Sequence, residues 1–157
     1  HGGELIYLNH SKAFDMFQST RPSLTRDFYF YQQGWDAQIN QAYCGVASSM
    51  AVLNSLRGKI NLPQDPIYAP FPWATQQTLV RNDCVRQNVY DVDKMKNQFW
   101  GLGLDMATTF LNCHLQGQGY IARAYPVDPN ITTAHEIRSI FIEALKDDDS
   151  RIIINYD

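Results

Sequence analysis

Residues 38–48 read Gln-Ile-Asn-Gln-Ala-Tyr-Cys-Gly-Val-Ala-Ser and place Cys44 at the start of the clearest helical pattern in the chain. Apolar residues recur behind it at spacings of three and four, and Arg57-Gly58 supplies a basic last turn and a stop. We therefore predict a helix from about Cys44 to about Leu56. The backbone N–H groups and the macrodipole at the start of a helix favour an anion, so a thiolate would be stabilised there. The pattern makes Cys44 a candidate nucleophile.

Neighbours of Cys44 fit the same chemistry. The side-chain NH2 of Gln38, six residues earlier, can reach back toward the helix start. There it could join the Cys44 backbone N–H in binding the oxyanion of a tetrahedral intermediate. Tyr43 and Gly45 are candidate substrate-binding residues, since glycine would let a substrate approach closely. The alternative is a buried structural cysteine behind a polar loop, and spacing alone leaves both readings open.

The composition is typical of one globular domain. The chain has 157 residues, of which 45% are hydrophobic and 13% aromatic, which is enough to form a core. Its 13 Lys and Arg and 16 Asp and Glu give a net charge of −3 with no basic cluster, which argues against a nucleic-acid partner. No apolar stretch approaches the roughly 20 residues that span a bilayer, which argues against a membrane partner. Without repeats or linkers, we predict a single domain over residues 1–157.

Further helices and strands are predicted along the chain. We expect helices at Asp91–Leu102, at Asp105–Gln116 and behind the capping box Thr133-Ala134-His135-Glu136. Two segments have strand patterns, Tyr120–Tyr125 by alternation and Arg151–Tyr156 as a continuous apolar run. A buried strand needs neighbours on both sides, so we expect this chain to be the front part of a longer domain.

Three shorter segments give weaker patterns. Lys12–Gln18 could form a helical turn, and the aromatic run Asp27–Tyr31 is expected to be extended and packed on the core. Four prolines make Leu62–Trp73 a rigid surface loop.

The remaining cysteines and histidines have no catalytic pattern. Cys84 and Cys113 could form a disulfide in an oxidising compartment, although we expect Cys113 to be a helix-packing cysteine. Cys113 and His114 do not make a tetrahedral metal site, because adjacent helical side chains point about 100° apart. We therefore predict no metal held by the protein. We expect His114 and His135 to be surface or capping-region residues rather than a general base.

The stretch from Gln38 to Leu56 resembles the nucleophile region of phytochelatin synthases, the glutathione γ-glutamylcysteinyltransferases. The resemblance rests on Gln-x-Asn-Gln-Ala-Tyr-Cys-Gly-Val-Ala-Ser and on the continuation Met50-Ala51-Val52-Leu53-Asn54-Ser55-Leu56. Arg26-Asp27-Phe28-Tyr29 resembles the family's upstream aromatic segment, and the later predicted elements follow in the family's order. Residues 75–88 do not align.

The resemblance implies an α+β, papain-like cysteine peptidase fold, here its N-terminal helical part with the start of the β-sheet part. It implies that Cys44 attacks the Cys–Gly bond of glutathione, that glycine leaves, and that a γ-glutamylcysteinyl thioester forms on Cys44. A second glutathione or water then takes the acyl group. Gln38 matches the family's oxyanion-hole glutamine. A divalent metal such as cadmium or zinc would enter as the glutathione thiolate complex.

The resemblance also indicates which catalytic residues are absent. The family's catalytic histidine follows the strand that resembles Ile152–Tyr156, and the orienting aspartate and a substrate-recognising basic residue also come after it. We expect all three beyond Asp157, so residues 1–157 alone would be inactive or nearly so.

Two functions from different classes remain. One is an acyltransferase or peptidase acting on glutathione, in phytochelatin synthesis and metal detoxification. The other is a catalytically inactive papain-like fragment or pseudoenzyme that binds glutathione or a partner, and a general papain-like peptidase is a third reading. The sequence leaves open a homodimer. It also leaves open the location, which would be the cytoplasm, or the periplasm or exterior if a signal peptide preceded His1.

Overall fold

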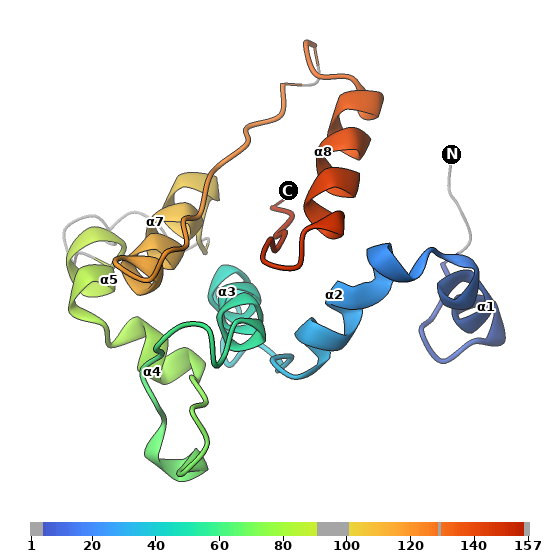
Figure 1. Cartoon of the computed structure of the whole chain (residues 1–157). Helices are drawn as coiled ribbons and strands as arrows, with labels where there is room; N and C mark the ends of the chain where they lie inside the picture. Colours follow the sequence, from blue (N-terminus) through green and yellow to red (C-terminus); the bar gives the residue numbers. More distant parts are fainter. Residues whose placement is uncertain (1–4, 91–100, 129, 156–157) are drawn as a thin grey trace.

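The computed structural model describes residues 5–90, 101–128 and 130–155, which form helices joined by loops (Figure 1). The elements, in chain order, are α1 (Ser11–Ser19), α2 (Pro22–Gln32), α3 (Cys44–Ser55), the 3-10 turn η1 (Pro66–Tyr68), α4 (Gln76–Val80), α5 (Asp83–Asn88), α7 (Leu104–Leu115) and α8 (Ala134–Lys146). No helix in the described ranges combines the length and the apolar character that a membrane span requires.

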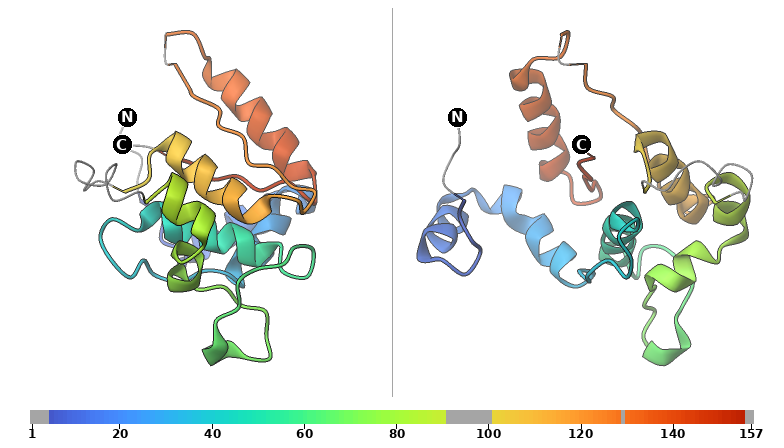
Figure 2. Two further views of the ribbon diagram at one scale, coloured as in Figure 1. Left: turned by 90° about the vertical axis from the view of Figure 1, so that its left-hand side faces the viewer. Right: turned by 180° about the vertical axis from the view of Figure 1, so that it is seen from behind.

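Helix α3 lies at the centre, with α1 and α2 on one side and α4, α5 and α7 on the other (Figures 1 and 2). It contacts α2, α4 and α7. Because it is covered on several sides, α3 buries most of its length, and its Val46, Met50 and Leu53 are at most 1% exposed. They share one core with apolar side chains of the neighbouring helices, such as Leu79, Val85 and Phe110. Burial of each such side chain contributes about 1.5–3 kcal/mol.

Most predicted helices are confirmed. The helix predicted from Cys44 runs to Ser55, and that predicted at Asp105–Gln116 is α7, shifted by one residue. The capping box also forms, because Thr133 Oγ1 accepts from the Glu136 N–H at 3.2 Å and Glu136 Oε2 accepts from the Thr133 N–H at 2.7 Å. The turn predicted at Lys12–Gln18 lies within α1. Residues 91–100 of the helix predicted at Asp91–Leu102 lie outside the described residues.

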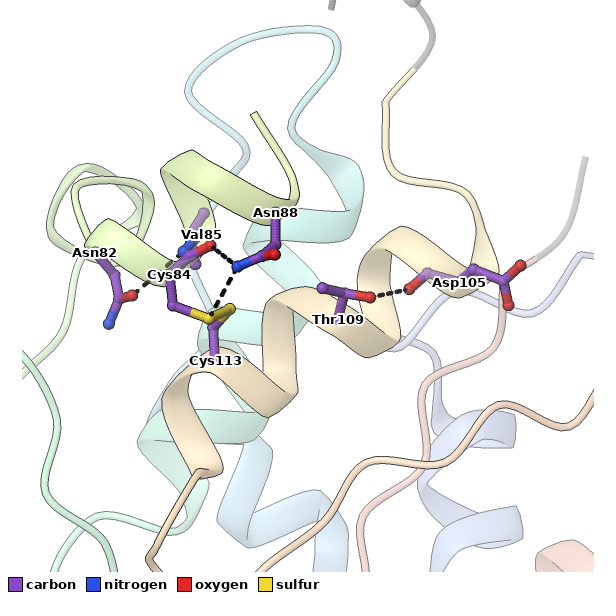
Figure 3. Close-up of a disulfide and its surroundings, with 7 residues drawn as sticks. All are labelled: Asn82, Cys84, Val85, Asn88, Asp105, Thr109 and Cys113. Carbon is purple, nitrogen blue, oxygen red and sulfur yellow. Dashed lines mark hydrogen bonds between the residues drawn. A yellow bond between two sulfur atoms is a disulfide. The ribbon is translucent and has the colours of Figure 1, made fainter. Parts of the chain in front are cut away.

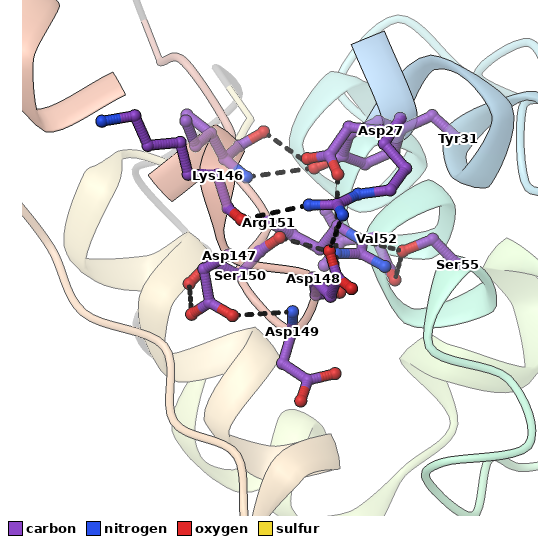
Figure 4. A network of polar contacts seen from close by, with 12 residues as sticks. Asp27, Tyr31, Val52, Ser55, Lys146, Asp147, Asp148, Asp149, Ser150 and Arg151 are labelled. Atoms are coloured by element: carbon purple, nitrogen blue, oxygen red, sulfur yellow. Dashed lines mark hydrogen bonds and ion pairs between the residues drawn. The ribbon is translucent and has the colours of Figure 1, made fainter. Parts of the chain in front are cut away.

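The Asp27–Tyr31 run is helical, so the prediction of an extended segment is wrong. It lies within α2, which begins at Pro22, a position where proline's missing N–H costs no helical bond. Asp27 and Tyr31 are four residues apart and therefore share one face of the helix. Figure 4 shows that face against the segment that carries Arg151. The aromatic composition is typical of a strand, but the contacts follow helical spacing.

Neither predicted strand pairs with another strand among the described residues. Polar side chains from helices α2 and α7 form hydrogen bonds with the backbone of the two segments that were predicted to be strands. The Tyr31 hydroxyl accepts from the Ile152 N–H at 3.0 Å and donates to the Ile152 carbonyl at 3.1 Å. Asn112 likewise donates to the Ala122 carbonyl at 3.0 Å and accepts from its N–H at 2.8 Å. The helical part of the predicted α+β fold is therefore present, and no sheet is seen in the described residues.

A buried ion pair joins α2 to the chain that follows α8 (Figure 4). The side chains of Arg151 and Asp27 are 4% and 6% exposed, and 3.6 Å separates Nη1 from Oδ1. Arg151 Nε also donates to Ser55 Oγ on α3 at 3.0 Å, and its guanidinium lies 4.5 Å from the centre of the Phe30 ring. Neither carboxylate oxygen of Asp27 accepts a hydrogen bond from the described residues. Burial raises the pKa of Asp27, and the charge of Arg151 opposes that rise.

A disulfide between Cys84 and Cys113 joins α5 to α7, with 5.5 Å between the Cα atoms (Figure 3). The sequence left this disulfide open as one alternative, and the structure contains it. The expectation that Cys113 is only a helix-packing cysteine is therefore wrong. Asn82 caps α5 by accepting from the Val85 N–H at 3.3 Å, and Asn88 Nδ2 donates to the Cys84 carbonyl at 2.9 Å. These contacts hold the short α5 in place.

Candidate active site

Cys44 is the first residue of α3, and its thiol is free and exposed. No side chain caps this end of the helix, and the bond from the Ala47 N–H to the Tyr43 carbonyl, at 2.8 Å, spans its first turn. The N–H groups of Cys44, Gly45 and Val46 come before this bond and have no acceptor within the helix. Exposure of the thiol contradicts the alternative of a buried structural cysteine. The thiol is available to a substrate at a helix end that favours an anion.

The loop before α3 folds into a tight turn around Asn40. The side-chain Oδ1 of Asn40 accepts from the Ala42 N–H at 2.8 Å, and the Asn40 carbonyl accepts from the Tyr43 N–H at 3.1 Å. Gln38 is exposed at the start of this turn, and its Nε2 donates to the Gln41 carbonyl at 3.2 Å. Gln38 and Cys44 are thus the two ends of one short, internally bonded segment.

Gly101 borders the thiol, a role that the sequence did not reveal. Its φ is +84°, and a β-carbon there would lie 3.5 Å from Cys44 Sγ and 3.1 Å from the Ala42 carbonyl oxygen. The sequence alone did not single out Gly101, because a single glycine does not show that its backbone takes a positive φ. A side chain at this position would therefore contact the sulfur.

Leu102 occupies the space that we expected Gly45 to leave for a substrate. A β-carbon on Gly45 would lie 2.8 Å from the β-carbon of Leu102, which is buried. The absence of a side chain at Gly45 therefore allows Leu102 to pack against α3. This packing role replaces the predicted reason for a glycine at that position.

Tyr43 and Tyr90 form an aromatic pair next to Cys44. Tyr43 is half-buried against the core, and its ring centre lies 6.5 Å from that of Tyr90. Tyr90 follows α5 and donates its N–H to the Val85 carbonyl at 3.0 Å. Burial raises the pKa of the Tyr90 phenol far above its usual range, and negative charge on Tyr43 or Cys44 raises it further. The phenol is therefore a neutral hydrogen-bond donor in this region, and the sequence did not single it out.

The described histidines have different surroundings. His114 is 5% exposed and packs on Phe110 with 5.2 Å between ring centres, so the prediction of a surface or capping-region residue is wrong. Burial lowers its pKa to about 4, and the backbone of Leu79 offsets part of that effect. His135 is exposed on α8, and His10 is exposed and contacts Tyr7. The described residues contain no cluster of three or more His, Cys, Asp or Glu side chains suited to a metal ion.

An exposed cysteine at an uncapped helix start, preceded by a polar loop with a glutamine, is compatible with nucleophilic chemistry by its thiol. A comparison with protein families agrees with this chemistry. The family model described as phytochelatin synthase matches residues 3–157. The chain therefore belongs to the phytochelatin synthase family. A search for similar sequences among curated proteins found no match.

Membership of this family defines the general biochemistry. The family's activity is that of glutathione γ-glutamylcysteinyltransferases, with glutathione as the substrate, and its N-terminal domain is papain-like. The helical architecture around α3 is the part of that fold seen in the described residues.

Proposed function

We propose that Cys44 is the nucleophile of an acyl-transfer reaction on glutathione. Its sulfur attacks the carbonyl carbon of the Cys–Gly peptide bond, the C–N bond breaks, and glycine leaves with its nitrogen protonated. A γ-glutamylcysteinyl thioester then remains on Cys44. The proposal is carried by the exposed free thiol at the uncapped start of α3, in a chain of this family.

Gln38 is assigned to the oxyanion hole. Its Nε2 carries two hydrogens, and only one is needed for the bond to the Gln41 carbonyl. The second is available to the oxyanion of the tetrahedral intermediate, together with the backbone N–H of Cys44. Loss of one such donor in other enzymes slows catalysis by roughly 10²–10³-fold.

The thioester has two acceptors. The amino group of a second glutathione would extend the peptide, whereas water would release γ-glutamylcysteine. A divalent metal such as cadmium or zinc would enter as the thiolate complex of the acceptor glutathione. Tyr43 and Tyr90 lie near enough to Cys44 to border the bound acyl group.

The reaction also needs a base for the thiol proton and an acid for the leaving amine. His114 is enclosed in the core, His135 lies on α8, and His10 contacts Tyr7, so none of them is assigned this role. The proposal takes the base from outside the described residues.

Mass spectrometry of the full natural protein after incubation with glutathione tests the proposal. The peptide that contains Cys44 should gain the mass of one γ-glutamylcysteinyl group while free glycine appears, and Cys44→Ser should give neither. A folded protein with a free Cys44 thiol that gains no adduct and releases no glycine would contradict the proposal. That outcome would favour a protein that binds glutathione without turning it over.

A further inference from the structure

The side chain of Gln76 holds the backbone on both sides of Gln38. Gln76 is the first residue of α4 and is 1% exposed. Its Nε2 donates to the Ala37 carbonyl at 2.8 Å, and its Oε1 accepts from the Ile39 N–H at 3.2 Å. One buried amide thus binds the residue before and the residue after the proposed oxyanion donor.

This contact is anchored to the helix that begins with Cys44. Asn54, on α3 and also 1% exposed, donates to the Ala74 carbonyl at 2.9 Å and accepts from the Ala74 N–H at 3.1 Å. Ala74 precedes Gln76 by two residues, and Thr75 between them starts α4 with a capping box. Two buried amides, each with paired bonds, therefore link α3 to the Gln38 segment.

Residues 35–41 are otherwise exposed, so the bonds to Gln76 are a main attachment of this segment to the core. A buried amide is costly unless its polar atoms are paired, whereas an apolar side chain of the same length would fill the space without that requirement. The amide of Gln76 therefore fixes where residues 37–39 lie, which an apolar side chain that only packed in the same space would not do.

We propose that Gln76 is a positioning residue for acyl transfer, which fixes the direction of the Gln38 amide relative to Cys44. The inference rests on the proposed function, because Gln76 acts through Gln38 and touches no reacting atom. Its sequence neighbour Gln77 is exposed on the same helix and offers a matched control.

The test compares Gln76→Met with Gln77→Met, each with and without Gln38→Ala, in the full natural protein. Methionine keeps the length of the side chain and removes both bonds to residues 37 and 39. The probe is p-nitrophenyl acetate: the Cys44 sulfur attacks the ester carbonyl, p-nitrophenolate leaves, and a thioacetate remains. The rate of the Cys44→Ser protein is subtracted.

We expect Gln76→Met to slow acylation about 10-fold when Gln38 is present and less than about 2-fold when it is absent. Gln77→Met should keep the wild-type rate. Deuterium exchange at the Ile39 amide should become faster in Gln76→Met, while the amides of α3 keep their protection. An equal slowing in both backgrounds would indicate a structural role only and overturn the inference. A wild-type rate in Gln76→Met or in Gln38→Ala would also overturn it.

A second variant applies if Gln76→Met does not fold. In Gln76→Glu, a protonated carboxyl can donate and accept as the amide does, but a carboxylate cannot donate to the Ala37 carbonyl. Its rate relative to that of the wild type should fall as pH rises through the titration of the glutamate. A ratio that stays flat with pH would overturn the inference.

The probe keeps the two proposals separate, because the ester contains no part of glutathione. A protein that reacts with the ester in a Gln76-dependent way, but not with glutathione, supports the positioning role and contradicts the glutathione reaction. A protein that glutathione acylates equally well with and without Gln76 supports the reaction and contradicts the positioning role.

Discussion

Gly101 and Cys44 lie so close that a β-carbon on Gly101 would be 3.5 Å from the sulfur. The same β-carbon would be 3.1 Å from the Ala42 carbonyl oxygen, so the loop before α3 would have to shift. The positive φ of Gly101 is also a conformation that residues with side chains rarely adopt. Access to the thiol therefore depends on a residue outside the motif that contains Cys44.

Gly101→Ala should reduce the accessibility of Cys44. We expect alkylation of the thiol by iodoacetamide to slow about 5- to 10-fold, and the free energy of unfolding to fall by about 1–2 kcal/mol because of the positive φ. Gly117→Ala is the matched control, since Gly117 has φ of +74° but open space around it. It should lose similar stability and keep the wild-type alkylation rate. Equal alkylation rates in the two variants would show that Gly101 does not border the thiol.

Arg151→Met should strongly destabilise the protein, because it leaves the Asp27 carboxylate buried without its partner. We expect a loss of about 3 kcal/mol in urea unfolding at neutral pH. Burial already raises the pKa of Asp27 above its usual value, and loss of Arg151 would raise it further, so Asp27 would hold its proton to higher pH than in the unfolded chain. The folded state would then bind more protons, so the stability of this variant should fall as pH rises through that window.

Two further variants check the ion pair. Adding Asp27→Asn to Arg151→Met should recover part of the lost stability, since the buried charge is removed. Arg26→Met is a comparison variant, because Arg26 pairs with Asp148 at a more exposed site while its charge also lowers the pKa of Asp27, so it should cost less than Arg151→Met. Similar losses from Arg26→Met and Arg151→Met would argue against a special role for the buried pair.

Protonation of His114 should couple folding to pH. Its pKa is lowered from 6.5 to about 4 in the folded state, so between these values the unfolded chain binds more protons. The free energy of unfolding should therefore fall as pH drops from about 6.5 to 4, by at most about 3 kcal/mol. His114→Leu should lose this part of the pH dependence in urea unfolding, whereas His135→Leu, at an exposed site, should keep it. Equal pH profiles in the two variants would contradict a buried, neutral His114.

The disulfide predicts how many thiols can react. The chain has three cysteines, and two of them are joined, so one thiol should react with a chromogenic thiol reagent in denaturant without reductant. All three should react after reduction. The Cys84→Ala, Cys113→Ala double variant should lose about 3–4 kcal/mol of stability, as expected for a closed loop of this length. Three reactive thiols before reduction would show that the bridge is not formed.

Local signals in the sequence were sufficient for part of the fold. The start of α3 at Cys44 and the capping box at Thr133 and Glu136 depend on neighbouring residues, and both are as predicted. Helix α2 was not predicted because the aromatic composition of residues 27–31 is typical of a strand. The contacts that favour the helix join Asp27 and Tyr31 to Arg151 and Ile152, which lie far along the chain. The two predicted strands depend on pairing, which a single segment does not encode.

The candidate site also contains some residues that the sequence predicted and others that it did not. Cys44 and Gln38 are in one short motif, so the sequence brought them together as candidates, and their roles stay predictions. Gly101, Tyr90 and Gln76 reach the site from distant parts of the chain, through backbone approach, ring contact and buried hydrogen bonds. The burial of His114 and the pairing of Cys84 with Cys113 depend on how α5 and α7 pack, which periodicity alone does not predict.

The bridge between Cys84 and Cys113 has a consequence for protease digestion. A single cleavage anywhere between these residues would leave the two pieces covalently joined. The nicked protein would keep the mobility of an intact chain on a non-reducing gel and separate into two bands only after reduction. Nicking in this part of the sequence would therefore escape a non-reducing purity check.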